Sequence, residues 1–167
     1  MTGISIRRAG TMDAATLAAF GARTFLDAFA AQNRPEDIEV YVAATYGEGQ
    51  QRREIESPDV ITLLAENGGE LIGFAQVRRA PVEAGDVELA RFYVDRSLHG
   101  RGVAPLLMRA VEDAARELGG RSIWLGVWEH NPRAIAFYGK CGFTRCGTKP
   151  FLLGSDPQTD LVMRLTL

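Results

Sequence analysis

Residues 99–105, His-Gly-Arg-Gly-Val-Ala-Pro, constrain the fold more than any other part of the chain. They follow a β-type run over 87–94 and precede an amphipathic helical pattern that ends at Gly119-Gly120. Glycines let the backbone approach a ligand closely, and the first N–H groups of a helix have no partner within it. The stretch predicts an anion site at a helix start. Taken alone, a plain strand–helix connector explains the same turn equally well.

The composition narrows the protein class. The 167 residues are 46% hydrophobic and 24% charged, as expected for one globular domain spanning 1–167. A net charge of −2 argues against nucleic-acid binding, which needs a basic face. We find neither a signal peptide at the start nor a membrane-spanning run, so a cytoplasmic location is expected. Cys141 and Cys146 have no second ligand pair, so we interpret them as packing residues and expect no metal.

Periodicity and turn signals predict an ordered series of elements. A first strand at 4–7 is followed by helices over 11–28, from Pro35 to near Gly47, and over 50–56. Three strands follow, at 60–65, 71–77 and 87–94, the first two joined by a tight turn at Asn67-Gly68-Gly69. After the helix that follows the glycine turn come a strand at 122–127 and a short helix from Asn131-Pro132 through Tyr138. Two strands, at 143–149 and 160–165, close the chain.

Two motifs at matching separation resemble the Gcn5-related N-acetyltransferase (GNAT) family. His99-Gly100-Arg101-Gly102-Val103-Ala104 resembles its acetyl-CoA turn, Gln/Arg-x-x-Gly-x-Gly/Ala, with His in the first position. Residues 131–138, Asn-Pro-Arg-Ala-Ile-Ala-Phe-Tyr, followed by Gly142-Phe143, are similar to its C-terminal signature. The resemblance covers essentially the whole chain. It implies an α/β (α+β) GNAT fold, with a mixed, mostly antiparallel twisted sheet flanked by helices and a V-shaped splay between the two central strands.

The expected donor is acetyl-CoA, used as a co-substrate. Its pyrophosphate suits the N–H groups of residues 100–104, with Arg101 as a charge-assisted partner, while Pro105 offers no N–H. By resemblance, the strand at 92–94 pairs with the pantetheine arm, and a backbone N–H near Val94 polarises the thioester carbonyl. The expected acetyl-CoA residues are therefore Phe92, Tyr93, Val94, His99, Gly100, Arg101, Gly102, Val103, Ala104, Pro105, Asn131 and Tyr138. For His99, phosphate contact and simple capping of the turn both remain open.

Tyr138 is the expected general acid. It lies seven residues after Asn131, two helical turns on and therefore on the same face. A phenol near the departing sulfur protonates the CoA thiolate, because ordinary thiol and phenol pKa values are similar, about 8.5 and 10. The alternative is an ordinary core aromatic, which is how we interpret Phe137. Asn131 is expected to bond the pantetheine, to cap the helix, or to do both.

The general base is less sharply defined. A primary amine with a pKa near 10.4 must lose a proton before attack, which costs roughly 4–5 kcal/mol at pH 7. Glu88 is the first candidate, since it lies on the strand that enters the splay, and Glu129 is the second. Both are equally compatible with solvated charges. Some relatives carry a basic glutamate at the position of Gly126, so that mechanism is not available here.

Several residues are candidates for contact with the acceptor. Trp124 and Trp128 share one face of a strand and suit either core packing or a cation–π wall, and Trp128 with Glu129 forms the expected acceptor contact. His130 is able to titrate near neutral pH at the mouth of the site. Asp156 and Asp160 suit either a distal ammonium or a turn.

Within the GNAT family the chain is most similar to the PaiA-type spermidine/spermine acetyltransferases. The similar segments are Trp124 to Glu129, Gly154 to Leu161 and the helices near Thr24 and Pro35. The resemblance implies acetyl transfer to a small primary amine, a polyamine first of all, by direct attack in a ternary complex. A homodimer is compatible with it. Two alternatives remain: an acetyltransferase of peptide or protein amines, and a non-catalytic acetyl-CoA-binding regulatory protein.

Overall fold

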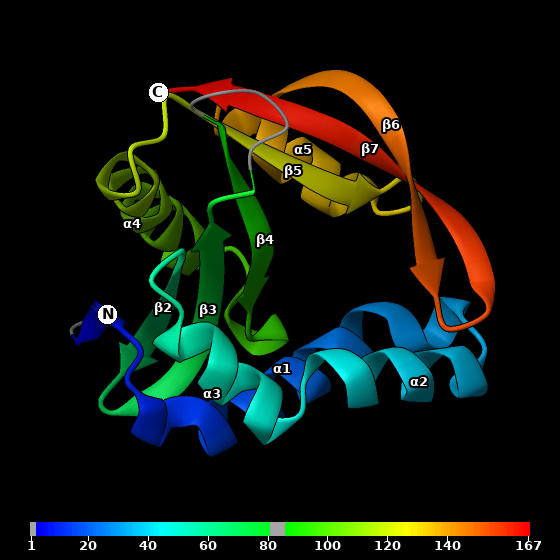
Figure 1. Cartoon of the computed structure of the whole chain (residues 1–167), viewed down its shortest axis with the longest axis horizontal. Coiled ribbons are helices and arrows are strands. Elements are labelled where there is room, and N and C mark those ends of the chain that lie inside the picture. Colours follow the sequence, from blue (N-terminus) through cyan, green and yellow to red (C-terminus); the bar gives the residue numbers. More distant parts are fainter. Residues whose placement is uncertain (1–2, 81–85) are drawn as a thin grey trace.

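The computed structural model describes residues 3–80 and 86–167. Seven strands form one sheet in the order β1-β2-β3-β4-β5-β7-β6, and every pairing is antiparallel except that of β4 with β5 (Figure 1). The strands are β1 (Ile4–Arg8), β2 (Val60–Asn67), β3 (Glu70–Arg78), β4 (Asp86–Val94), β5 (Ser122–Trp128), β6 (Thr144–Leu153) and β7 (Asp156–Thr166). The expected mixed, mostly antiparallel sheet is confirmed.

The helices cover both faces of this sheet. They are α1 (Ala14–Phe29), α2 (Pro35–Thr45), α3 (Glu48–Glu56), α4 (Val103–Glu117) and α5 (Pro132–Lys140), with short 3₁₀ turns η1 (Thr11–Asp13), η2 (Ala30–Gln32) and η3 (Arg96–Leu98). One core cluster joins α4, and the half-buried apolar side chains of α5, to one face. A second cluster packs α1 and α2 against the opposite face, through Phe74 of β3 and Leu153 of β6. Within the described ranges, no helix has the length and apolar character needed to cross a membrane.

The two central strands separate along their length. β4 and β5 are paired only from Asp86–Ser122 to Glu88–Trp124, and the remaining residues of β4 have no partner on β5. Aromatic side chains of α5 pack against the freed half of β4: Phe137 stacks on Phe92 with ring centroids 5.5 Å apart, and Tyr138 meets the same ring edge-on at 6.2 Å. The expected V-shaped splay is therefore present, and its apex lies at Glu88.

Local signals explain much of the chain path. Gly68 and Gly69, both at positive φ, form the two-residue turn between β2 and β3, as their sequence predicts. Asn131 caps α5 by accepting a hydrogen bond from the Ala134 N–H at 3.3 Å, with Pro132 in the first turn.

The closing strands β6 and β7 are longer than predicted and form a hairpin that reaches α2 (Figure 1). At its tip, Ser155 donates two hydrogen bonds, from N and Oγ, to Oδ1 of Asp37 at 2.8 and 2.7 Å.

Candidate active site

A cavity of about 460 Å³ lies in the splay. Residues 89–94 of β4 and 125–128 of β5 form its two long walls, and α1 and α5 contribute Phe29, Asn131 and Tyr138. At its apex end β4 carries a bulge, because Gln76 pairs with Arg91 while Val77 pairs with Leu89, which leaves Ala90 without a partner on β3. Bulges of this kind recur beside active sites, where they redirect backbone groups toward a ligand.

The glycine turn lies at the other end of this cavity. Gly100 and Gly102 have φ of +79° and +83°, a conformation that favours glycine, and a Cβ at either position would meet no other atom within 4 Å. The space beside the turn is thus open to a ligand. His99 Nε2 lies 3.0 Å from the Val94 carbonyl oxygen, so this side chain braces the turn against the end of β4. Because α4 begins at Val103, its first N–H groups lack partners within the helix, as an anion site requires.

The residues expected to bind acetyl-CoA divide into two groups. Those that line the cavity are Phe92, Tyr93, Val94, His99, Gly100, Ala104, Asn131 and Tyr138. Arg101, Gly102, Val103 and Pro105 do not line it; the Val103 side chain is buried in the core below the turn. Two cations that the sequence motifs did not point to, Arg96 of η3 and Arg133 of α5, line the cavity together with His99. They bring positive charge to the cavity that the glycine turn borders, and such charge suits a phosphate group.

Tyr138 is held in an apolar surrounding at the cavity wall. Its ring meets Phe92 and Phe143 edge-on, with centroid separations of 6.2 and 5.8 Å. Burial raises the pKa of the phenol well above its ordinary value, and the nearby Cys141 thiol adds to the shift. The phenol is therefore protonated at neutral pH, the state that a general acid requires.

A second cavity of about 220 Å³ adjoins the first. Aromatic side chains form most of its apolar wall: Phe25, Phe29, Tyr41, Tyr93, Trp128 and Phe151. Its charged groups are Arg78, Glu88, Arg91, Lys149 and Asp160. The two cavities share Phe29 of α1, Leu89, Ala90, Arg91 and Tyr93 of β4, and Gly126 and Trp128 of β5 as lining residues. They therefore meet just above the apex of the splay, beside the bulge.

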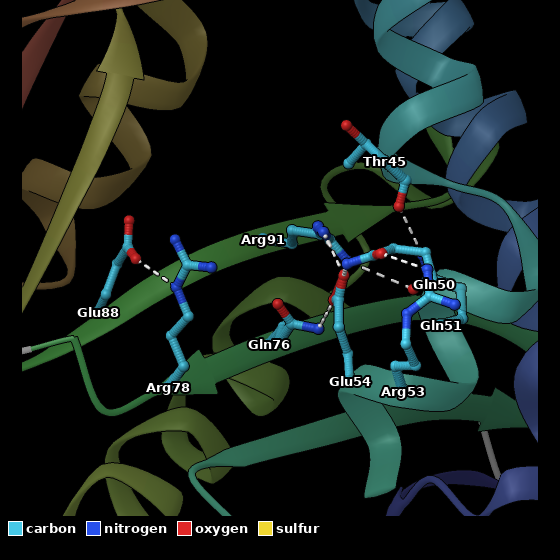
Figure 2. A network of polar contacts seen from close by, with 9 residues as sticks. All are labelled: Thr45, Gln50, Gln51, Arg53, Glu54, Gln76, Arg78, Glu88 and Arg91. Atoms are coloured by element: carbon cyan, nitrogen blue, oxygen red, sulfur yellow. Dashed lines mark hydrogen bonds and ion pairs between the residues drawn. The ribbon is translucent and has the colours of Figure 1, made fainter. Parts of the chain in front are cut away.

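Glu88 lies in the smaller cavity and not in the larger one. Its residue is 7% exposed, and its Oε1 accepts a hydrogen bond from Nε of Arg78 at 2.5 Å (Figure 2). Arg78 and Glu88 are direct cross-strand partners on β3 and β4. The carboxylate expected to act as the base is thus already hydrogen-bonded to a guanidinium.

Arg91 belongs to a buried polar network beside the shared wall (Figure 2). Its two terminal nitrogens donate to both carboxylate oxygens of Glu54 on α3, at 2.6 and 2.9 Å. Gln76 Nε2 donates to the same carboxylate at 2.5 Å, and Arg91 also donates to Gln51 at 3.3 Å. Because its charge is matched by Glu54, Arg91 positions β4 and adds little net charge to the cavity.

Of the two residues expected to contact the acceptor, Trp128 lines the cavities and Glu129 does not. Trp128 lines both cavities and meets Phe29 edge-on at 5.8 Å. Trp124 shares its strand face, as expected, but packs under Lys149 and donates its indole N–H to the Ala80 carbonyl at 3.2 Å. Glu129 lines neither cavity, and its carboxylate lies 3.3 Å from Nε2 of the exposed His130.

The structure adds an acidic residue at the junction. Asp160 of β7 is 7% exposed and lies directly between Trp128 of β5 and Lys149 of β6 in the strand register. Its Oδ2 would lie 3.0 Å from a Cβ built at Gly126. The carboxylate therefore stands over Gly126, a residue that both cavities share. The sequence offered Asp160 only as a distal ammonium ligand or a turn residue, because the β6–β7 register was not known.

These features fit acetyl-CoA in several respects: a cavity between two splayed strands, an open glycine turn at a helix start, two arginines in the cavity lining and a half-buried tyrosine at the wall. Among the described residues, no cluster of His, Cys, Asp and Glu is arranged to hold a metal ion.

Comparison with known proteins agrees with this geometry. The model of the acetyltransferase (GNAT) family matches residues 24–143. An uncharacterized N-acetyltransferase of Lactobacillus delbrueckii subsp. lactis is 32% identical over 172 residues, covering all of this chain and 99% of the relative. Another from Mycobacterium bovis is 37% identical over 151 residues, covering 90% of this chain and 96% of the relative. The PaiA N-acetyltransferase of Thermoplasma acidophilum, solved with coenzyme A, superposes with a TM-score of 0.84 at 24% identity, covering 99% of this chain and all of the other. The chain therefore belongs to the GNAT family of acetyl-CoA-dependent N-acetyltransferases.

Proposed function

We propose that this enzyme transfers the acetyl group to a small primary amine by direct attack in a ternary complex. One observation carries the proposal: the two cavities adjoin and share Phe29, Leu89–Arg91, Tyr93, Gly126 and Trp128. An amine in the smaller cavity and a thioester in the larger one would meet at this shared wall, each entering from its own side. Such placement supports transfer without a covalent enzyme intermediate, because it holds both reactants in attack geometry.

Different residues of the chain bind the donor, polarise its carbonyl group and protonate its sulfur. The glycine turn, Arg96 and Arg133 bind the phosphates, and the freed edge of β4 offers its backbone groups to the pantetheine arm. The sequence placed the carbonyl-polarising N–H near Val94. The shared wall extends from Leu89 to Tyr93 and includes the bulge at Ala90, so we propose that the donor lies within 89–93. Tyr138 protonates the leaving sulfur.

A polyamine is the acceptor that we propose to test first. The carboxylates of Glu88 and Asp160 and the aromatic walls suit an alkyl ammonium, through charge and cation–π contacts. The fold likeness to the PaiA enzyme is compatible with this choice. However, Arg78 lies beside Glu88 and Lys149 beside Asp160, so the cavity is close to neutral. A long polycation would therefore place its distal ammonium groups outside the cavity.

Release of CoA from acetyl-CoA is the direct test. We would measure it with spermidine, spermine, a set of amino acids and a lysine peptide. Turnover with polyamines alone supports the proposed acceptor, whereas turnover with the peptide alone replaces it by a protein or peptide amine. Acetyl-CoA binding without turnover across a broad amine panel would favour the non-catalytic regulatory alternative.

Tyr138→Phe tests the role of the phenol in the same assay. We expect kcat to fall about 10²–10⁴-fold while the acetyl-CoA Kd stays within a few-fold, since only proton donation is lost. Tyr46→Phe is the matched control, because Tyr46 is buried in the core and lines neither cavity. An unchanged kcat for Tyr138→Phe would refute the acid role.

We further propose that residues 1–167 act as one domain, since a single sheet supports both cavities. The cytoplasmic location and the homodimer implied by the resemblance stay predictions, to be checked by cell fractionation and by sedimentation.

A further inference from the structure

We propose that Asp160 is the general base that takes the proton from the acceptor ammonium, a role that rests on the proposed amine acetylation. Of the acidic side chains in the smaller cavity, Glu88 is bonded to Arg78 at 2.5 Å. Asp160, by contrast, receives no hydrogen bond from any residue in the described parts of the chain. Its carboxylate is available for a ligand.

The position of this carboxylate matches the reaction. Oδ2 stands over Gly126, within 3.0 Å of where a Cβ would be, and Gly126 lines both cavities. A side chain at position 126 would occupy this space and would also collide with Cε of Lys149. The chain thus brings a carboxylate over Gly126 from the neighbouring strand β7.

The surroundings of Asp160 favour proton uptake. Burial raises the pKa of this carboxyl, and the charge of Lys149 only partly opposes the shift. The other titratable groups that face the same cavity are Tyr41 of α2, Arg78 of β3, and Glu88, Arg91 and Tyr93 of β4. Arg78 and Arg91 are paired with Glu88 and Glu54, so Lys149 is the principal cation acting on Asp160. A base with a raised pKa accepts a proton from an ammonium more readily than an ordinary aspartate.

The proton balance is complete with these two residues. Asp160 accepts one proton from R–NH₃⁺ and later releases it to solvent. The neutral amine forms the N–C bond to the acetyl carbon, and the C–S bond breaks. The sulfur takes the phenolic proton of Tyr138, and the second proton lost from nitrogen restores that phenol. The products are the N-acetyl amine, CoA thiol and one proton in solution.

The pH dependence of Asp160→Asn tests the proposal. In the wild type, kcat/KM for the amine rises as Asp160 ionises and then levels off. Without the base only the neutral amine reacts, so log(kcat/KM) should climb with unit slope through neutral pH toward the amine pKa. At pH 7 we expect a loss of about 10²–10⁴-fold, with the acetyl-CoA Kd unchanged. An amine whose pKa lies below the assay pH needs no base, and it should restore most of the lost rate.

Two further variants keep the outcome decisive. Lys149→Met removes the charge that lowers the pKa of Asp160, so the acidic limb should move to higher pH. Glu88→Gln should keep the acidic limb but move it to lower pH, because Arg78 then loses its counter-charge beside Asp160. A wild-type profile in Asp160→Asn, or loss of the limb in Glu88→Gln, would overturn the assignment in favour of Glu88. If the wild type itself acetylates no amine, the proposed function fails and not this assignment alone.

Discussion

Replacing Glu54 by alanine should strongly destabilise the protein, because it removes one partner of a largely buried ion pair. Glu54 and Arg91 join α3 to the middle of β4, and their side chains are only 13% and 12% exposed (Figure 2). Alanine removes a carboxylate that accepts two hydrogen bonds from Arg91 and one each from Gln76 and Gln50. It leaves a guanidinium that stays charged at every accessible pH, buried and without its counter-charge.

The magnitude follows from this imbalance. Removing one partner of a buried ion pair costs about 3–5 kcal/mol, because the remaining charge is uncompensated. For a chain of this size such a loss lowers Tm by about 6–20 °C. Replacing both partners, as Glu54→Leu with Arg91→Met, removes the buried charge altogether. This double variant should therefore be more stable than Glu54→Ala, although it removes more polar contacts.

Chemical denaturation of the three proteins, followed by circular dichroism, measures these differences. The same measurement at several pH values tests the contribution of the Glu54 carboxyl. Burial alone would raise the pKa of Glu54, but the hydrogen bonds and charge of Arg91 outweigh it, so the pKa is lowered. A lowered carboxyl pKa stabilises the fold at neutral pH. This contribution is lost as the pH falls from the pKa of an ordinary glutamate through the lowered pKa of Glu54. In acid the wild type should lose stability relative to the double variant, which lacks the Glu54 carboxylate. If Glu54→Ala stays within about 1 kcal/mol of the wild type, the pair is not a buried ion pair.

The remaining predictions concern local conformation and the donor cavity. Gly154→Ala should lower the free energy of unfolding by about 1–3 kcal/mol, since φ is +57° and the new Cβ would lie 2.5 Å from Cα of Asp37. Gly139→Ala, in α5 with open space around it, is the control and should stabilise by about 0.5–1 kcal/mol; thermal unfolding separates the two. Arg133→Ala should raise the acetyl-CoA Kd about tenfold and weaken its salt dependence, as measured by calorimetry; no change would remove Arg133 from the phosphate site.

Local sequence signals predicted the glycine turn and the helix start that border the larger cavity. The glycine turn after β4 and the Asn131–Pro132 start of α5 each depend on a few adjacent residues, and the structure has both where the sequence predicts them. Such signals are strong because only glycine tolerates the required φ and because a cap acts within one turn.

The acceptor half was harder to predict, because it depends on the pairing of distant strands. Pro150 and Pro157 interrupt the β pattern, so β6 and β7 were predicted too short; β6 is an edge strand, where proline is tolerated. Without these bounds the register that places Lys149 opposite Asp160 was not accessible. Glu88 was correctly placed beside the splay, but its bond to Arg78 depends on the β3–β4 register, which includes a bulge.

The hydrogen bonds between Ser155 and Asp37 have a consequence for how acceptor preference can change. The helices near the start of the chain and the hairpin near its end build one wall together, while the middle of the chain carries the glycine turn and α5. Exchange of the β6–β7 hairpin alone between relatives would break the hydrogen bonds to Asp37 of α2 and distort that wall. Chimeras that take both end segments from one parent and the central segment from another should keep acetyl-CoA affinity and inherit the amine preference of the parent that supplied the ends.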